Sequence, residues 1–229
     1  MLRFPILLTN DDGINSPGLQ HLASSLHSLG HPIAILAPLT EQSAVGMKLT
    51  LRDDMAFEEH TDIAEKIRTD ESAPLRVFSL DGSPCDCVIV AIDGGLRSLA
   101  PEIRPWLCIS GINRGPNLSI DVLHSGTVSA AREASLYGLP SLSVSLATYS
   151  HQDYSQSIEA TLALVERLSH LVTAEPSNIL RPEGSRMRPI RGTGTNSLRS
   201  WFMQGNMFLN LNIPENWNGT FQTVPLGAR

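Results

Sequence analysis

The sequence predicts an α/β fold in three layers, with a doubly wound, largely parallel sheet between two layers of helices. Short continuous apolar runs bounded by turn residues are typical of strands that are buried on both faces. The segments between these runs repeat their apolar residues at helical spacing and begin with capping residues. The two kinds of segment alternate along most of the 229 residues. Such alternation favours parallel strands joined by helical crossovers.

The N-terminal segment predicts a strand, a helix and a second strand. The apolar runs are residues 4–9 (FPILLT) and 32–38 (PIAILAP). The segment between them begins with Ser16 as a candidate N-cap and Pro17 at the first helical position, and Gly30 marks its end. These positions define a β-α-β unit.

The stretch from about 48 to 80 predicts an inserted hairpin or flap with a half-exposed face. Its polar and apolar side chains alternate, and it carries clustered charge. Residues 58–72 (EEHTDIAEKIRTDES) could instead form an excursion with little order. The preceding residues 39–53 are polar and contain glycine, so we expect a loop that returns over the sheet.

The rest of the chain continues the alternation. Helices are expected within 82–96, 125–140 and 154–172, and strands within 105–113, 140–146 and 208–214. The part from about 174 to 229 is less regular, and its stretch 181–206 is basic and turn-rich. We therefore treat 1–229 as one Rossmann-like domain with an inserted flap and a C-terminal extension.

The composition is that of an ordinary globular protein, with 41% hydrophobic and 17% charged residues. No stretch reaches the roughly 18 uninterrupted apolar residues of a spanning helix. The apolar run at the N-terminus is too short for a secretory segment. We therefore expect a cytoplasmic protein without a membrane partner. The net charge of −6 also disfavours a nucleic-acid partner, because binding to a phosphate backbone requires a basic face.

The cysteines and histidines show no spacing typical of a metal site. The three cysteines, Cys85, Cys87 and Cys108, are odd in number and sparse, which argues against a disulfide framework, and we expect them to be buried. His27 and His31 lie four positions apart, but the intervening glycine is expected to end the helix. Both are therefore predicted to lie at the surface.

Two adjacent carboxylates, Asp11 and Asp12 in "TNDDG", follow the first predicted strand. Ligands of open parallel sheets bind beyond the carboxyl ends of the strands. A carboxylate pair repels a phosphate group unless a cation reverses the charge. Two Asp with a hydroxyl, an amide and water form the ligand set that Mg²⁺, Mn²⁺ or Ca²⁺ prefers. Alternatively, Asp11 caps the turn and Asp12 is solvated, since this sequence is common in turns.

Three other segments are expected at the same edge of the sheet. "EQSAVG" follows the second strand. In "SGINRGPN", two glycines permit tight backbone geometry, and Asn113 offers an oxygen to a cation or an amide donor to an oxyanion. "HSGTV" opens a helix with Ser125, Gly126 and Thr127, where backbone N–H groups attract an anion. The simpler alternatives are an Asn-Gly connection without a ligand and an ordinary serine cap.

Together these segments resemble the SurE family (survival protein SurE) of metal-dependent 5'-nucleotidases. The resemblance spans most of the chain and rests on "ILLTNDDGINSPGL", "APLTEQSAVG", "GSPCDCV", "SGINRGPNLSIDVLHSGTVSAAREASLYGLPSLSVS" and "FLNLNIP". It implies one divalent metal ion per subunit, Mg²⁺ or Mn²⁺, held by Asp11, Asp12, Ser43 and Asn113.

The resemblance also implies a phosphate site and a substrate class. Asn113 would bind phosphate with Ser125, Gly126 and Thr127, and Asn10 lies beside the metal, where it can orient a ligand. The implied substrates are nucleoside 5'-monophosphates, with a side activity on short polyphosphate. The resemblance and the apolar alternating segments imply a homodimer or homotetramer. Family members normally continue beyond "VPLGAR" into an extension used in subunit contacts.

The chain departs from the family pattern at three positions. His124 stands where tyrosine is frequent, Ser135 where glycine is usual and Cys85 where alanine is usual. Of these, only His124 is close enough to the expected site to affect the chemistry, as a possible proton carrier. Arg114 and Arg132 lie within or next to the phosphate-binding segments and could steer an anion.

The expected reaction is hydrolysis through a metal-activated water. Asp11 and Asp12 are the predicted catalytic residues: they hold the ion, and either could accept the proton of the water. The start of the helix at 125–140 would hold the phosphoryl group against the metal. An aspartyl-phosphate on either acid is the rival mechanism.

Two other function classes remain open for such a sheet. One is a non-hydrolytic nucleotide-binding module, although the G-x-G-x-x-G fingerprint is absent after the first strand. The other is a nucleotide-sugar transferase, in which an acidic pair also holds a metal. Phosphate release from a monophosphate without an acceptor sugar distinguishes the phosphatase from both.

Overall fold

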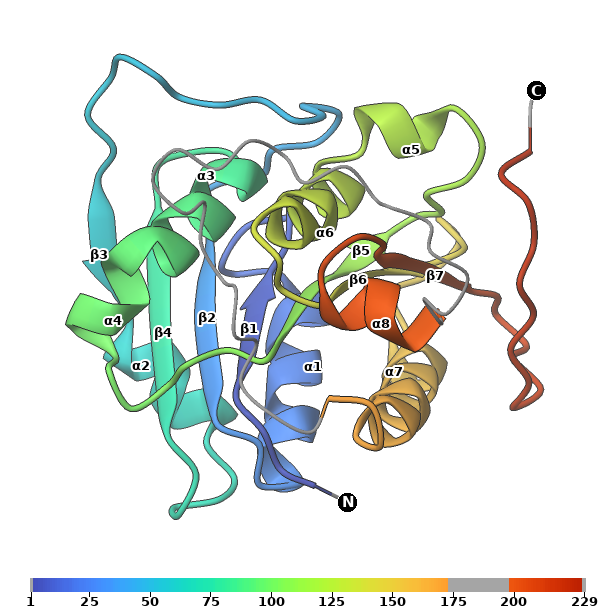
Figure 1. Ribbon diagram of the computed structural model, residues 1–229, viewed down its shortest axis with the longest axis horizontal. Coiled ribbons are helices and arrows are strands. Elements are labelled where there is room, and N and C mark those ends of the chain that lie inside the picture. Colours follow the sequence, from blue (N-terminus) through green and yellow to red (C-terminus); the bar gives the residue numbers. More distant parts are fainter. Residues whose placement is uncertain (1, 173–197, 228–229) are drawn as a thin grey trace.

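The computed structural model describes residues 2–172 and 198–227. The predicted stretch 181–206 therefore lies mostly outside the described residues. The strands are β1 Ile6–Thr9, β2 Ile33–Pro38, β3 Phe57–Glu59, β4 Leu75–Leu80, β5 Leu107–Arg114, β6 Ser141–Leu146 and β7 Leu209–Ile213. They form one seven-stranded sheet in the order β3-β4-β2-β1-β5-β6-β7. Figure 1 shows this sheet from β3 at the left to β7 at the right.

The pairing confirms the largely parallel sheet. β3 runs antiparallel to β4, and every other neighbouring pair is parallel. The helices are α1 Pro17–Ser28, α2 Thr61–Ile67, α3 Pro84–Val90, α4 Leu96–Leu99, α5 Asp121–His124, α6 Gly126–Leu136, α7 Ser155–Leu168 and α8 Leu198–Met203. A π-helical turn, Ala91–Gly95, joins α3 to α4.

Two apolar cores separate the sheet from its helices. One contains the inner faces of α1, α2 and α7, and the other those of α3, α4 and α6. Within β1, Ile6 and Leu8 belong to the first core and Leu7 to the second. Because successive side chains of a strand point to opposite faces, a strand between two helical layers buries both faces and is largely apolar. This explains the continuous apolar runs.

Helix α1 follows its sequence signals closely. Ser16 occupies the N-cap, Pro17 the first helical turn, and Gly30 adopts a positive φ of 81° just after the helix. Leu22 and Leu26 of its apolar stripe are fully buried. The predicted β-α-β unit at the N-terminus is confirmed.

The stretch from 48 to 80 differs from the predicted flap in its second half. The first half is largely exposed and leads to the edge strand β3. Residues 61–67 form helix α2, and β4 lies inside the sheet, parallel to β2. Arg76 and Ser79 interrupt the apolar pattern of β4 and suggest an exposed face, yet Val77 and Phe78 are both buried. Val77 and Phe78 pack into opposite cores because helices cover both sides of β4.

The prediction that His27 and His31 lie at the surface is wrong, since both are fully buried. Nδ1 of His27 accepts hydrogen bonds of 3.1 Å from the backbone N–H groups of Thr69 and Asp70. Its Nε2 lies 3.0 Å from the carbonyl oxygen of Ala73. The ring thus satisfies polar backbone groups of the turn before β4, which periodicity along α1 does not reveal. The three cysteines are buried, as predicted.

Strand order places the candidate site. Among the parallel strands, β2 and β4 lie on one side of β1, and β5, β6 and β7 lie on the other. The crevice at the carboxyl ends of β1 and β5 is therefore the switch point at which such sheets bind ligands. Thr9 of β1 pairs with Ser110 of β5, so the polar residues after both strands meet. No helix within the described ranges is long and apolar enough to cross a membrane.

Candidate active site

An open cleft of about 410 Å³ lies at the switch point. Its walls come from the loops after β1, β2 and β6, from the last residue of β5 and from the start of α1. The lining residues are Asp12, Ser16, Pro17, Glu41, Ser43, Arg114, Tyr149, Gln152 and Tyr154. Acidic side chains therefore line part of the cleft and aromatic side chains another part.

Asp11 is buried and held by the first turn of α6. The backbone N–H of Thr127 donates to Oδ2 at 2.9 Å, and its hydroxyl donates to Oδ1. The acid thus receives two donors from a helix N-terminus, where negative charge is favoured. Burial raises the pKa of Asp11 despite these hydrogen bonds, which lower it.

Asp12 faces the cleft. The backbone N–H of Arg114 donates to its Oδ2 at 3.3 Å. Burial and the neighbouring charge of Asp11 raise the pKa of Asp12 to about 6, and Glu41 adds to the repulsion. Positive charge from Arg114 does not compensate for these effects. The free energy cost of concentrating this negative charge would be relieved by a cation.

Gly126 is the position at which α6 approaches the acid. A Cβ atom there would lie 2.8 Å from Cβ of Asp11 and 3.0 Å from its Oδ2. Real Cβ atoms do not tolerate the shorter of these distances, so glycine permits the contact with Asp11. Ser125 caps the helix, and its Oγ accepts a 3.0 Å hydrogen bond from the N–H of Val128.

The loop after β2 is tied to this edge at several points. The backbone N–H of Gln42 donates to the carbonyl of Asp11 at 2.7 Å, and that of Gly46 donates to the carbonyl of His124 at 2.8 Å. Further along, the N–H of Thr50 donates to the carboxylate of Asp86 at 3.0 Å. These contacts place Ser43 in the cleft wall, where its hydroxyl donates to Glu41.

Asn113 and Asn10 keep amide oxygens available. Nδ2 of Asn113 donates to the carbonyl of Gly115 at 2.8 Å, so its Oδ1 is the atom that could meet a cation. Nδ2 of Asn10 donates to the carbonyl of Gly13 at 3.0 Å and closes the loop after β1. Oδ1 of Asn10 is buried and has no hydrogen-bond partner among the described residues.

The donors at this edge fit a hard divalent cation. They are carboxylate, hydroxyl and amide oxygens, and the acids repel one another. In the described part of the chain, no three His, Cys, Asp or Glu side chains gather into a metal site. A site here therefore needs its hydroxyl and amide donors as well as its two aspartates. All of the predicted site residues lie at this edge: Asn10, Asp11, Asp12, Ser43, Asn113, Ser125, Gly126 and Thr127.

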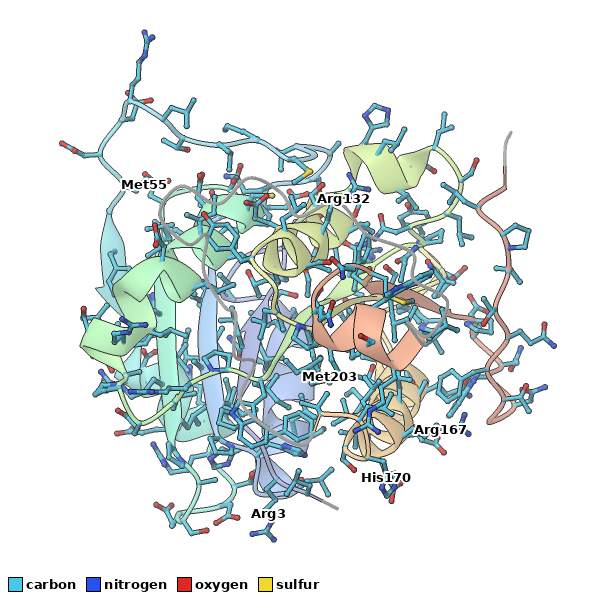
Figure 2. All side chains as sticks on the ribbon, viewed as in Figure 1. Arg3, Met55, Arg132, Arg167, His170 and Met203 are labelled. Atoms are coloured by element: carbon cyan, nitrogen blue, oxygen red, sulfur yellow. The ribbon has the colours of Figure 1, made fainter. Side chains whose placement is uncertain are left out.

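The two candidate arginines differ in their position relative to the cleft. Arg114 lines the cleft. Arg132 lies on α6 (Figure 2) and is not among the residues that line the cleft. Nη1 of Arg132 lies 3.7 Å from the sulfur of Met47, and its guanidinium lies 5.8 Å from the ring centroid of Phe208. His124 ends α5, and its carbonyl rather than its ring makes the contact with the loop after β2.

Sequence reasoning missed an asparagine network beside the site. The N–H of Asn117 donates to Oδ1 of Asn212 at 2.8 Å. Its carbonyl accepts from Nδ2 of Asn210 at 2.9 Å and of Asn212 at 3.1 Å. The network fastens the loop after β5 to β7. The alternating asparagines of "FLNLNIP" are the available signal, because residues two apart on a strand share a face.

Glu41 is the other residue that the sequence did not single out. It lines the cleft and raises the pKa of both Asp11 and Asp12 through its charge. Glu41 directly precedes Gln42 in "EQSAVG". The backbone hydrogen bond between Gln42 and Asp11 therefore brings Glu41 close to the two aspartates.

Comparisons with known proteins agree with this architecture. The SurE family, described as survival protein SurE, is matched over residues 6–228. A protein named 5'-nucleotidase SurE from Syntrophotalea carbinolica is 42% identical over 192 residues, which is 82% of this chain and 69% of that protein. Another of the same name from Synechococcus elongatus is 41% identical over 165 residues, 72% of this chain and 59% of that protein.

A solved structure gives the same match in three dimensions. The crystal structure of the SurE protein from Aquifex aeolicus superposes with a TM-score of 0.62 at 28% identity, and the match covers 92% of this chain and 66% of that one. The chain thus spans between 59% and 69% of the lengths of these three relatives.

Proposed function

This chain belongs to the SurE family, and on that premise we propose that its cleft is the active site of a divalent-metal-dependent phosphatase. The enzyme hydrolyses nucleoside 5'-monophosphates to nucleoside and phosphate. The observation that carries the proposal is the meeting of Asp11 and Asp12, at the end of β1, with the first turn of α6 at the switch point of the sheet. The names of two relatives as 5'-nucleotidases support the substrate class.

Four side chains would hold one divalent ion, Mg²⁺ or Mn²⁺: Asp11, Asp12, Ser43 and Asn113. Such an ion supplies positive charge to the phosphoryl oxygens and lowers the pKa of water. The contacts of Thr127 fix the carboxylate of Asp11 before any ion binds. The backbone N–H of Arg114 does the same for Asp12.

The start of α6 positions the phosphoryl group. Ser125, Gly126 and Thr127 lie at its N-terminus, where the helix dipole favours negative charge. Asn113 contributes from the neighbouring strand end, and Asn10 orients the ligand from the loop after β1. Arg114 in the cleft wall adds positive charge toward the substrate. A carboxylate oxygen of Asp11 or Asp12 takes the proton from the attacking water.

The test is phosphate release from a panel of nucleoside 5'-monophosphates, with short polyphosphate included. The assay is run with EDTA and again after Mn²⁺ or Mg²⁺ is restored, on the wild type and on Asp12→Asn. Asp62→Asn, which changes an exposed acid of α2, is the matched control. Metal-dependent release that is lost only in Asp12→Asn is the expected result.

Two outcomes would favour the other function classes. Nucleotide binding without phosphate release under every metal indicates a binding module. Turnover only in the presence of an acceptor sugar indicates a nucleotide-sugar transferase. A trapped phosphoenzyme would replace the direct attack of water by the aspartyl-phosphate route.

The assembly is part of the same proposal: a homodimer or homotetramer. Leu118, Ile120 and Leu123, in and before α5, are 45–59% exposed, and a second copy of the chain could cover them. Light scattering coupled to size exclusion tests the expected mass.

A further inference from the structure

The wall of the cleft formed by the loop after β6 presents an exposed aromatic ring. Tyr149 follows β6 and lines the cleft together with Asp12 and Gln152. The residue is 67% exposed, the largest exposed fraction among the described tyrosines. A tyrosine ring normally buries its apolar faces, so a ring left open beside charged groups is available to a ligand.

The ring of Tyr149 packs against the backbone of Gly115. A Cβ atom at that position would lie 2.1 Å from Cε1 of Tyr149 and 2.4 Å from its Cζ. The tyrosine therefore packs directly on the glycine backbone, which itself adopts a positive φ of 105°. The positive φ disfavours any larger residue at position 115, and a Cβ atom there would displace the ring of Tyr149. This contact restricts the ring on one side and so reduces the entropy lost when a ligand covers it.

Arg114 links the aromatic wall to the acidic end of the cleft. Its backbone N–H donates to Asp12 at 3.3 Å, and its Nη2 donates to the carbonyl of Tyr149, also at 3.3 Å. Arg114 thus connects the carboxylate of Asp12 to the backbone of Tyr149. Asp12 and Tyr149 line the same cleft, so a ligand with its phosphate beside Asp12 can extend toward Tyr149.

The other aromatic residue of the cleft cannot serve in the same way. Tyr154 is only 4% exposed, and its ring packs against Gly18 at the start of α1. Its ring therefore has no open face for a planar ligand. Gln152, in contrast, lines the cleft and carries an amide that both donates and accepts hydrogen bonds.

We propose that Tyr149 stacks on the base of the nucleoside 5'-monophosphate and that Gln152 hydrogen-bonds the edge of that base. This assignment rests on the proposed function, because it takes the base of that function's substrate as the ligand of Tyr149. Stacking is tolerant of base identity, since every base has a π-face. The amide of Gln152 can likewise hydrogen-bond both donor and acceptor groups on a base. Tyr149 thus selects base-bearing monophosphates over sugar phosphates and accepts both purines and pyrimidines.

The first test measures adenosine binding by calorimetry without metal. Tyr149→Ala is expected to weaken adenosine binding about tenfold, because a lost base stack commonly has an effect of that size. Tyr149→Phe and Tyr149→Trp keep an aromatic face and should retain the affinity. His151→Ala, in the same loop but outside the cleft lining, is the matched control. Equal adenosine affinity in wild type and Tyr149→Ala, or no adenosine binding to the wild type, would overturn the assignment.

The second test uses phosphate release and separates base recognition from a general structural defect. Tyr149→Ala should raise KM about tenfold for adenosine and cytidine 5'-monophosphates and leave KM for ribose 5-phosphate nearly unchanged. An equal rise for all three substrates would contradict the proposal. If the wild type releases no phosphate from any of them while adenosine binding still depends on Tyr149, the proposed hydrolysis fails and the base site stands.

Discussion

Thr127 binds Asp11 through two donors, its backbone N–H at 2.9 Å from Oδ2 and its hydroxyl at Oδ1. The two residues lie 116 positions apart in the chain. The contact therefore fixes an acid that follows β1 to α6, the helix that precedes β6, and the orientation of Asp11 depends on α6. The predicted phosphate-binding turn and the predicted metal-binding acid form one structural unit, with Thr127 as a positioning residue for Asp11.

Replacing Thr127 by valine tests this unit. Thr127→Val removes the hydroxyl donor and leaves Oδ1 of a buried carboxylate without it. We expect a loss of about 1–3 kcal/mol in the free energy of unfolding, measured by urea denaturation, and weaker Mn²⁺ binding. Thr127→Ser keeps both donors and should resemble the wild type. A valine variant with wild-type stability and Mn²⁺ affinity would show that the hydroxyl does not hold Asp11.

Glycine at position 126 is expected to be necessary for the site. In Gly126→Ala, the added Cβ would lie 2.8 Å from Cβ of Asp11, so α6 and the acid must move apart. We predict a loss of phosphate release of about tenfold or more, because small misplacements of catalytic groups are costly. Gly227→Ala, where no heavy atom lies within 4 Å, is the matched control. Full activity in Gly126→Ala would disprove the tight approach.

His31 should make stability depend on pH. It is fully buried and its ring packs edge-on against Phe4, 4.9 Å between centroids. Burial lowers the pKa of His31 below its usual 6.5. The unfolded chain therefore binds more protons than the folded protein as the pH falls through about 6.5, and the free energy of unfolding decreases there. Above that pH, the contribution of the neutral, buried His31 to the free energy of unfolding is fully present.

The measurement is the urea midpoint between pH 8 and pH 5.5. His31→Phe removes the titrating group and should flatten the decline over this window relative to the wild type. His151→Ala removes a 40% exposed histidine and should leave the decline as it is. Superimposable pH profiles for wild type and His31→Phe would rule out His31 as the cause.

The cysteines should be inert in the folded protein. Burial raises the pKa of the Cys85 and Cys108 thiols to about 12, and that of Cys87 also rises well above its usual value. Because the thiolate is the reactive form, we predict negligible reaction with a thiol reagent at pH 8 in the native state. All three should react in urea. Rapid labelling of any cysteine in the native protein would contradict the packing around α3 and β5.

Local patterns predicted most of the elements because local physics determines them. The cap and glycine of α1 and the apolar run of β1 are properties of short segments, and the alternation of such segments predicts a largely parallel sheet. The acids after β1 could be recognised for the same reason, since they follow a strand end directly. The position of β4 inside the sheet could not be predicted in this way. Arg76 and Ser79 give its sequence the pattern of a half-exposed strand, and only the packing of α2 and α3 over the strand shows that both faces are covered.

Other parts of the site depend on contacts between distant segments. The asparagine network requires β7 to pair with β6, and only then do Asn210 and Asn212 reach Asn117. The burial of His27 depends on the turn that precedes β4. Spacing along the chain carries no record of these pairings, so the sequence predicts the chemical types at the site better than their partners.

The central claim is that Asp11 and Asp12 make a cation site at the end of β1, and direct Mn²⁺ binding tests it. Electron paramagnetic resonance counts free Mn²⁺ during titration of the wild type, Asp12→Asn and the control Asp62→Asn. We predict one bound Mn²⁺ per chain in the wild type and control, and an affinity lower by at least about tenfold in Asp12→Asn, because a charged ligand is lost. Unchanged Mn²⁺ affinity in Asp12→Asn would contradict the account and leave the acidic pair without its proposed role.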